Sequence, residues 1–388
     1  MKKIFFYIVF SKFNNQKLIR LQNYLKYLKK IIPKSSKLIV LDLSKYYFGF
    51  NFDKRRKIQS QFNYLKINNF NDLKNICENK KVYGFGMLNH NVKQILLLIL
   101  IKKFKIKLIG IMSNGYFPQA YNNIKLSLLY RAKLAILYRG NYYFLRILSL
   151  LNITPSIEYY FEASQNRINF LKRKKTNKIA FFKNVIRINS DLYSSNKKNK
   201  NKKKYITYID SGYDHPDITQ KEIVTSEEKR KFFYNNLFNF LQFTEKVLKK
   251  KLIYCKHPKA KYPKYFKRFE KRFIVKTGNA EKFIRQSYLV LLSVSTLLNN
   301  VFFLKRKIMI VGSQHWGNLV KDKIFSIRKD IKVPFVNIDN FEKLSKRNYE
   351  SKIKFNSKIY ENFIQYNLVY DRKLTHIEQM KKNLSQIT

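Results

Sequence analysis

The chain has 388 residues, enough for two ordinary domains with buried cores. Its residues are 45% hydrophobic and 16% aromatic, which excludes an intrinsically disordered protein. The two cysteines, Cys77 and Cys255, exclude a disulfide framework and favour a reduced, cytoplasmic setting. The longest apolar stretch, residues 95–101, is far shorter than the ~20 residues of a membrane span, so we expect a cytoplasmic protein, at most peripheral on the inner membrane face.

The charge is extreme. The formal net charge is +56, with Lys+Arg 80 against Asp+Glu 24. One interpretation is a nucleic-acid-binding protein. The other is biased amino-acid usage, because Lys, Asn, Ile, Phe and Tyr are all abundant and the lysines are scattered along the chain, whereas a nucleic-acid footprint gathers on one face. Under either interpretation, the positive electrostatic field of the chain favours anionic partners such as nucleotide sugars and phospholipid headgroups.

The first half of the chain alternates strand patterns with helical ones. Residues 1–10 mimic a signal peptide, but their apolar run is short and lacks a small-residue cleavage site, so we expect the first core strand there. Further strands are expected at residues 37–41, 81–85, 107–111, 158–162 and 185–189, and helices at 17–30, 71–78 and 91–104. Residues 43–69 carry no clear pattern. This alternation predicts a Rossmann-like acceptor domain over residues 1–195.

Two basic segments of this half allow two interpretations each. Residues 123–151 are long, apolar and basic, which fits either a surface that leans on an anionic membrane or a buried helix pair with solvated lysines. Residues 196–204, NKKNKNKKK, cannot pack into a core. They predict a solvated linker between domains, with an electrostatic tether to phosphates as the alternative.

The second half repeats the alternation. Strands are expected at residues 205–209, 252–255, 273–276, 288–292 and 308–311, and a long helix at 226–250 with Ser226 as its cap. Residues 205–340 therefore predict a second Rossmann-like domain, which would bind a nucleotide sugar. Residues 341–388 predict a helical segment whose last helix crosses back to the first domain. The predicted fold class is α/β, with two Rossmann-like domains facing across a cleft.

The loop after the strand at 205–209 is rich in acidic groups. Asp210, Asp214 and Asp217 share it with His215. A carboxylate at the end of a strand can take a proton from an acceptor hydroxyl, and any of the three could be that base. The alternative is a turn whose carboxylates bond their own backbone.

Two more polar groups follow strands. Lys256, His257 and Pro258 end the run at 252–255, and the imidazole could donate to a diphosphate or a leaving phosphate. Here the alternative is a half-exposed histidine in a basic loop. Ser293, Ser295 and Thr296 follow the run at 288–292, and we expect these hydroxyls to begin a helix that favours a phosphate, unless they serve as plain caps.

The sequence offers no set of metal ligands and no cofactor motif. It contains no Asp-x-Asp pair to hold a cation on a diphosphate, no phosphate-binding P-loop, no Gly-x-Ser-x-Gly and no His-Glu-x-x-His. His90, His315 and His376 stand far apart in the chain. We therefore expect neither a metal nor a cofactor.

These residues resemble a known family. Two Rossmann-like halves, a strand followed by His257-Pro258, and the Ser295-Thr296 pair some 40 residues later are similar to the metal-independent GT-B glycosyltransferases of bacterial surface polysaccharides. The nearest groups are the sialyltransferases, polysialyltransferases and capsule Kdo-transferases. The resemblance implies that His257-Pro258 and Ser295-Thr296 bind the CMP part of the donor and that an Asp or Glu is the base. The acidic-acidic-glycine motif of the sialyltransferases is not present.

A second resemblance is to proteins encoded in lipopolysaccharide and capsule gene clusters. It rests on Asn189-Ser190-Asp191, Asp210, His215-Pro216-Asp217 and residues 256–259. Together the resemblances imply a glycosyltransferase that takes a nucleotide sugar, CMP-linked or otherwise, to a surface glycan or glycolipid. Nucleic-acid binding and a glycerol-phosphate-type transferase are the alternatives. The absence of zinc-finger, KH and RNP patterns counts against nucleic acid as a partner.

Overall fold

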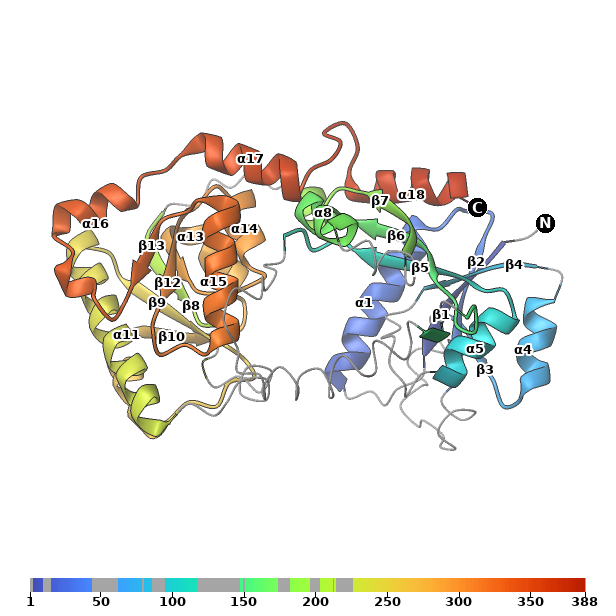
Figure 1. Ribbon diagram of the computed structural model, residues 1–388, viewed down its shortest axis with the longest axis horizontal. Helices are drawn as coiled ribbons and strands as arrows, with labels where there is room; N and C mark the ends of the chain where they lie inside the picture. The colour runs from blue at the N-terminus through green and yellow to red at the C-terminus, as the bar shows by residue number, and fades with distance from the viewer. Residues whose placement is uncertain are drawn as a thin grey trace. The chain divides into compact units, whose positions relative to one another are not determined.

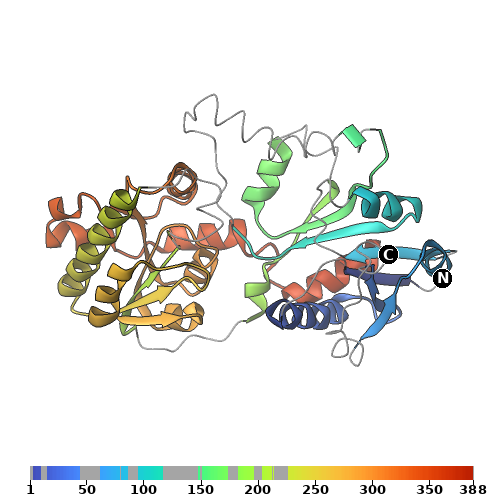
Figure 2. The same ribbon diagram turned by 90° about the horizontal axis from the view of Figure 1, so that it is seen from below.

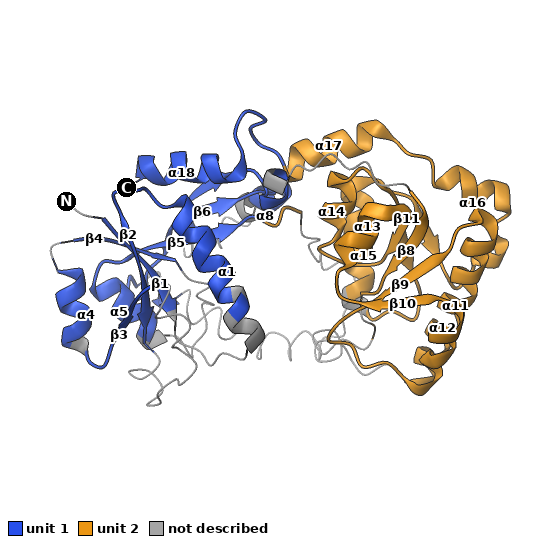
Figure 3. Cartoon of the chain, turned by 180° about the vertical axis from the view of Figure 1, so that it is seen from behind, with its two compact units in different colours: residues 1–113, 126–194, 369–388 blue, residues 114–125, 195–368 orange. Residues whose placement is uncertain are grey.

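The computed structural model describes residues 3–9, 15–43, 62–78, 80–85, 95–116, 147–148, 151–173, 182–195, 203–211, 213 and 226–387. The chain divides into two compact units, coloured separately in Figure 3. Unit 1 comprises residues 1–113, 126–194 and 369–388, and unit 2 comprises residues 114–125 and 195–368. The junction after residue 194 adjoins the predicted linker, whereas the predicted C-terminal segment 341–388 is shared between the two units.

Unit 1 is built on one parallel sheet in the order β3-β2-β1-β4-β5-β6-β7 (Figure 1). Every described neighbouring pair in this sheet is parallel. Its strands are β1 (Lys3–Val9), β2 (Lys37–Asp42), β3 (Asn63–Lys66), β4 (Lys81–Phe85), β5 (Lys107–Met112), β6 (Ile157–Glu162) and β7 (Phe182–Arg187). The helices are α1 (Asn15–Ile31), α4 (Phe70–Cys77), α5 (Ile95–Lys103), α8 (Gln165–Arg173) and α18 (His376–Ile387), with the 3-10 turn η4 (Asp191–Ser195).

Both faces of this sheet are covered, because successive side chains of its strands point in opposite directions. On β1, Phe6 packs into a cluster with residues of α4 and α5. Its neighbour Phe5 packs into a second cluster, formed with α1 and α18. The run of apolar residues in these strands reflects burial on both faces, as parallel sheets require.

The last helix of the chain belongs to unit 1. α18 packs along α1, which Figure 2 shows as a red helix beside a dark blue one. His376 is buried at the start of α18 and accepts from the Tyr27 hydroxyl at 2.6 Å, while its Nδ1 donates to the Asn189 carbonyl at 2.6 Å. Because a carbonyl can only accept, Nδ1 must carry a proton. Burial lowers the pKa of His376.

Unit 2 is a second parallel sheet, in the order β10-β9-β8-β11-β12-β13. Its strands are β8 (Tyr205–Ile209), β9 (Leu252–Lys256), β10 (Ile274–Thr277), β11 (Ser287–Leu292), β12 (Lys307–Gly312) and β13 (Phe335–Asn337). Its helices are α11 (Glu227–Leu248), α12 (Lys267–Arg272), α13 (Ala280–Gln286), α14 (Leu298–Phe303), α15 (Asn318–Ile331), α16 (Lys346–Lys352) and α17 (Ser357–Asn367), with the 3-10 turns η5 (Lys264–Phe266) and η6 (Phe341–Lys343). The predicted cap is confirmed, since Ser226 accepts from Lys229 N at 3.3 Å.

Both sheets have the strand order of a Rossmann fold, in which the order reverses beside the first strand. The predicted α/β class with two Rossmann-like domains is therefore confirmed. Their facing across a cleft stays a prediction. Sequence patterns missed β3 and β13, which are both short edge strands. None of the helices within the described ranges is both long enough and apolar enough to cross a bilayer.

Candidate functional site

The order of the unit 2 sheet reverses between β8 and β11. In open parallel sheets, ligands bind just beyond the carboxyl ends of the strands at such a reversal. The two strands on either side end at Ile209 and Leu292, so the next residues on each chain segment lie at this point. They include Asp210 and Ser211 on one side and Ser293 on the other.

The loops after β8 and β11 are tied together. Ser211 Oγ accepts a hydrogen bond from Val294 N at 2.9 Å. Ser293 is fully buried and donates to the Val311 carbonyl on β12 at 2.7 Å. These bonds hold the backbone that follows β11 in one place. The Ser293 hydroxyl is therefore bonded within the protein, where it fixes this loop to β12.

His257 is positioned by a tyrosine and an aspartate. Its backbone N–H donates to the Tyr262 hydroxyl at 2.7 Å, and the Tyr262 hydroxyl donates to Asp210 Oδ2. Asp210 is only 4% exposed, so its carboxylate depends on such donors. The His257 ring accepts from Lys259 N at 3.3 Å through Nδ1, so the proton of the neutral ring is on Nε2. The turn after β9 is thus fixed to the end of β8.

Lys256 and Pro258 flank this histidine. Lys256 pairs with Glu270 at 3.1 Å, and its ammonium lies 4.5 Å from the centre of the Tyr262 ring. Its charge is therefore partly used within the protein. Pro258 is exposed at the turn. Their expected role in donor binding stays a prediction.

The hydroxyls after β11 do not cap a helix, so that expectation was wrong. α14 begins at Leu298 after Leu297, and no side chain caps it. The Ser295 hydroxyl instead accepts from Leu297 N at 3.2 Å, in a turn that precedes the helix. Thr296 is exposed. The physical reason is that residues 295–297 form a tighter turn, in which Leu298 N bonds the Ser295 carbonyl at 3.2 Å.

A polar cluster that the sequence analysis missed lies two strands further along the same edge. Ser313 follows β12, and its hydroxyl donates to Asp339, which follows β13, at 2.9 Å. His315 lies on the same loop, with Nε2 4.0 Å from Asp339 Oδ1 and its ring stacked on Phe232. The Tyr213 hydroxyl donates to the His315 carbonyl at 2.9 Å, so this loop is also linked to the loop after β8.

Three predicted site residues, Asp214, His215 and Asp217, lie outside the described residues. Of the acidic loop, only Asp210, Ser211 and Tyr213 are described. At the described positions, the strand order brings Asp210, His257 and Ser295 to one edge of one sheet. His257 and Ser295 follow β9 and β11, which lie on either side of β8.

The motif Asn189-Ser190-Asp191 belongs to unit 1 and has a structural role there. Asn189 Nδ2 donates to the carbonyls of Asp371 and Leu374 at 2.7 and 2.6 Å. Its Oδ1 accepts from Tyr370 N at 2.6 Å and from Asp371 N at 2.9 Å. This side chain therefore fastens the C-terminal segment to the end of β7.

Unit 1 also holds a buried carboxylate at the carboxyl edge of its sheet. Glu162, the last residue of β6, is fully buried. It pairs with Arg167 Nε at 3.1 Å and accepts from Ser164 N at 3.1 Å and from the Tyr160 hydroxyl at 3.3 Å. Burial raises the pKa of Glu162 to about 7, although the arginine and the N–H donor act in the opposite direction.

Glu162 should give unit 1 a measurable pH dependence. Because its pKa is higher in the folded protein than the ordinary value of 4.5, its contribution to stability is full below that value and is lost as pH rises through about 7. We expect Glu162→Gln to flatten this decline by on the order of 2 kcal/mol between pH 5 and 8. Urea unfolding of the unmodified protein and of Glu162→Gln across this pH range tests the prediction. The titration of His376 affects the stability of both proteins equally, so it cancels in the comparison. Parallel curves would contradict the assignment.

Neither a cluster of metal ligands nor a related sequence indicates the function of this protein. Within the described ranges, no three His, Cys, Asp or Glu side chains gather as a metal site requires. No protein-family model matches the sequence. No curated protein matches it either.

The fold, however, is similar to solved structures. A variant of the wall teichoic acid polymerase TagF aligns with a TM-score of 0.51 and 12% identity over 100% of this chain and 90% of that one. The glycosyltransferase of kitacinnamycin aligns with a TM-score of 0.47 and 8% identity, over 100% and 98%. S. aureus MnaA with UDP gives 0.46 and 11%, over 100% and 95%. Of these three, only the TagF alignment exceeds 0.5, and at its low identity it shows a shared fold.

Proposed function

We propose that this protein is a glycosyltransferase that moves a sugar from a nucleotide-sugar donor to another glycan. The observation that carries the proposal is the convergence of three loops at the reversal of the unit 2 sheet. These loops supply His257, the Ser295-Thr296 pair and the Asp210 network. The fold shared with a wall teichoic acid polymerase supports it.

The chemistry assigned to these groups follows from their positions. A sugar leaves its nucleotide as negative charge develops on the phosphate, and donors fixed in advance stabilise that charge. His257 would donate through Nε2, and the hydroxyls and backbone N–H groups of Ser295 and Thr296 would bind the phosphate oxygens. We assign Asp210 to positioning, because its carboxylate is buried and engaged by Tyr262. Asp214 or Asp217 would then take the proton of the acceptor.

Donor and acceptor can be proposed more finely from the resemblance. In the sialyltransferase-like and Kdo-transferase groups, a His-Pro turn and a Ser/Thr pair bind CMP, so we propose a CMP-linked donor of sialic acid or Kdo type. The acceptor would be lipopolysaccharide, capsule or another surface glycan. The proposed place of action is the cytoplasmic, inner face of the membrane, where anionic headgroups attract a chain with a net charge of +56.

A screen of donors tests this proposal. The purified protein is incubated with CMP-sugars and UDP-sugars in EDTA, and release of the nucleotide is measured. We expect turnover of one class in EDTA and a loss of about 100-fold or more in His257→Ala, the size typical of removing one charge-stabilising donor. If no nucleotide sugar binds or turns over, or if His257→Ala has no effect, the proposal fails.

A related glycerol-phosphate-type transferase is the second candidate. The fold shared with the wall teichoic acid polymerase TagF is compatible with this candidate as well. The same loops would serve it, since its donor also leaves a nucleotide phosphate. Adding CDP-glycerol to the screen separates the two, because turnover of CDP-glycerol alone would select this candidate.

A further inference from the structure

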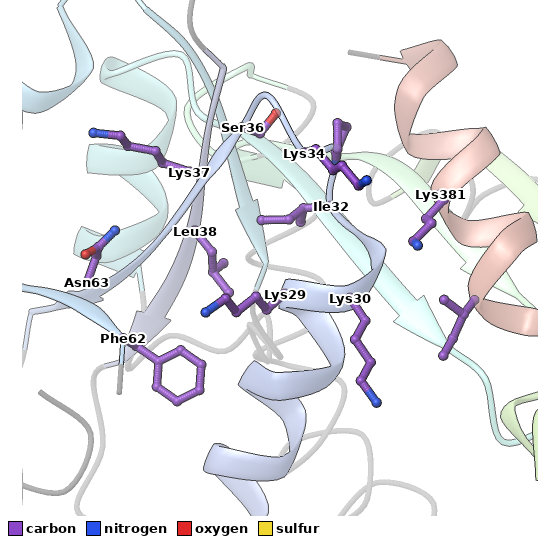
Figure 4. Close-up of a pocket in the computed structure, with 12 residues that line it drawn as sticks. Lys29, Lys30, Ile32, Lys34, Ser36, Lys37, Leu38, Phe62, Asn63 and Lys381 are labelled. Atoms are coloured by element: carbon purple, nitrogen blue, oxygen red, sulfur yellow. The ribbon is translucent and has the colours of Figure 1, made fainter. Parts of the chain in front are cut away.

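A basic pocket of about 750 Å³ opens at the amino-terminal edge of the unit 1 sheet (Figure 4). It lies where α1 ends and β2 begins, with α18 on a third side. Asp42 and Glu162 end β2 and β6 at the opposite, carboxyl edge of this sheet. The pocket is therefore separate from the places where an open parallel sheet ordinarily binds its ligand.

The lining is strongly and uniformly basic. Twelve residues form it, of which five are lysines and none is acidic: Lys29, Lys30, Lys34, Lys37 and Lys381. Over the whole chain, Lys and Arg number 80 in 388 residues. The lining thus carries about twice the density of cations of the chain as a whole.

Within the part of the chain that the structure describes, none of the five ammonium groups forms an ion pair or a hydrogen bond, although the charge of Lys381 acts on Glu378, one turn earlier in α18. The nearest acidic residue along α18 is Glu378, which is held by the Thr375 N–H and hydroxyl, each at 2.8 Å. Lysines in the last turn of a helix complement its dipole, which explains Lys29 and Lys30. It does not explain the other three.

The floor of the pocket differs from its rim. Ile32 and Leu38 are each 8% exposed and form an apolar floor. The Ser36 hydroxyl belongs to the lining, is buried, and has no hydrogen-bond partner among the described residues. The five lysines give the pocket a positive charge, which favours an anion.

We propose that this pocket binds a phosphate-bearing anion, supplied by a lipid headgroup or by a free polyphosphate. Lysine ammonium groups act as point charges, which suit a phosphate approached from several directions. A volume of about 750 Å³ accommodates more than one phosphate group and lies within the usual range of ligand sites. The inference does not depend on the chemistry of glycosyl transfer, because it concerns a different edge of a different unit.

Removal of three charges tests the pocket directly. The variant Lys29→Gln/Lys37→Gln/Lys381→Gln takes one exposed lysine from each of α1, β2 and α18. The matched control, Lys74→Gln/Lys282→Gln/Lys343→Gln, removes the same charge at exposed lysines elsewhere. One arm titrates inorganic tripolyphosphate by calorimetry. The other measures co-sedimentation with phosphatidylglycerol vesicles, with phosphatidylcholine vesicles as the neutral reference.

We expect the pocket variant to bind at least 10-fold more weakly in one arm, while the control changes by less than about 3-fold, as screened long-range charge would. Loss in the vesicle arm alone identifies a headgroup, and loss with tripolyphosphate identifies a free anion. Equal losses in the pocket and control variants, or no loss in either arm, would overturn the proposal.

Discussion

Replacement of Tyr262 by phenylalanine is expected to raise the KM for the donor by about 10- to 100-fold, with a smaller change in kcat. The Tyr262 hydroxyl donates to the buried Asp210 carboxylate and accepts from the His257 N–H, so its loss removes one hydrogen-bond partner from each group. The turn that carries His257 should then lose its fixed position. Steady-state kinetics with the donor from the screen provide the measurement.

The matched control is Tyr288→Phe. Its hydroxyl also takes part in a side-chain hydrogen bond, from Lys307 Nζ at 2.9 Å, but it lies at the start of β11 and so at the amino-terminal edge of the sheet. We expect its kinetics to match those of the unmodified protein. A KM unchanged in Tyr262→Phe, or changed equally in both variants, would show that the Asp210 network does not position His257 for the donor.

Replacement of Asn189 by alanine is expected to destabilise unit 1 by about 3 kcal/mol. The side chain makes four hydrogen bonds to the backbone of residues 370–374, and each of those backbone groups would lose its partner. The contact of α18 with α1 should weaken with it, because His376 bonds the Asn189 carbonyl. Urea unfolding followed by fluorescence, together with the rate of proteolytic cleavage before α18, measures the effect.

Asn184→Ala serves as the comparison for this variant. Asn184 is exposed and makes one side-chain bond, to the Glu158 carbonyl at 3.1 Å. A surface change of this kind is expected to alter stability by less than about 0.5 kcal/mol. If Asn189→Ala changes stability as little as Asn184→Ala, the hydrogen bonds of the Asn189 side chain do not hold the C-terminal segment.

The architecture could be predicted from the sequence because the buried parallel strands are continuous apolar segments. The strands β11 and β12, for example, follow each other as SYLVLL and KIMIVG. Two of the four edge strands, β3 and β13, lack this pattern, whereas the edge strands β7 and β10 were predicted. β3 alternates exposed and half-buried residues, and β13 has only three residues, so neither was predicted.

Only part of the candidate site could be predicted from the sequence, because local patterns show where strands end but not which distant residues meet. His257 and Ser293 directly follow well-defined strands, and sequence position alone places them at the carboxyl edge. Tyr262 reaches Asp210 across 52 residues of sequence, which no local pattern indicates. Asp339 was missed because β13 was missed. Ser313, which follows the predicted run at 308–311, could have been found by the same rule that found Ser293.

Amide hydrogen exchange, measured with and without the nucleotide donor from the screen, tests the central claim most directly. If the carboxyl edge of the unit 2 sheet holds the donor, exchange should slow at residues 256–259 and 293–297, and this slowing should disappear in His257→Ala. Slowing confined to unit 1 or to the amino-terminal edge of the unit 2 sheet would contradict the account.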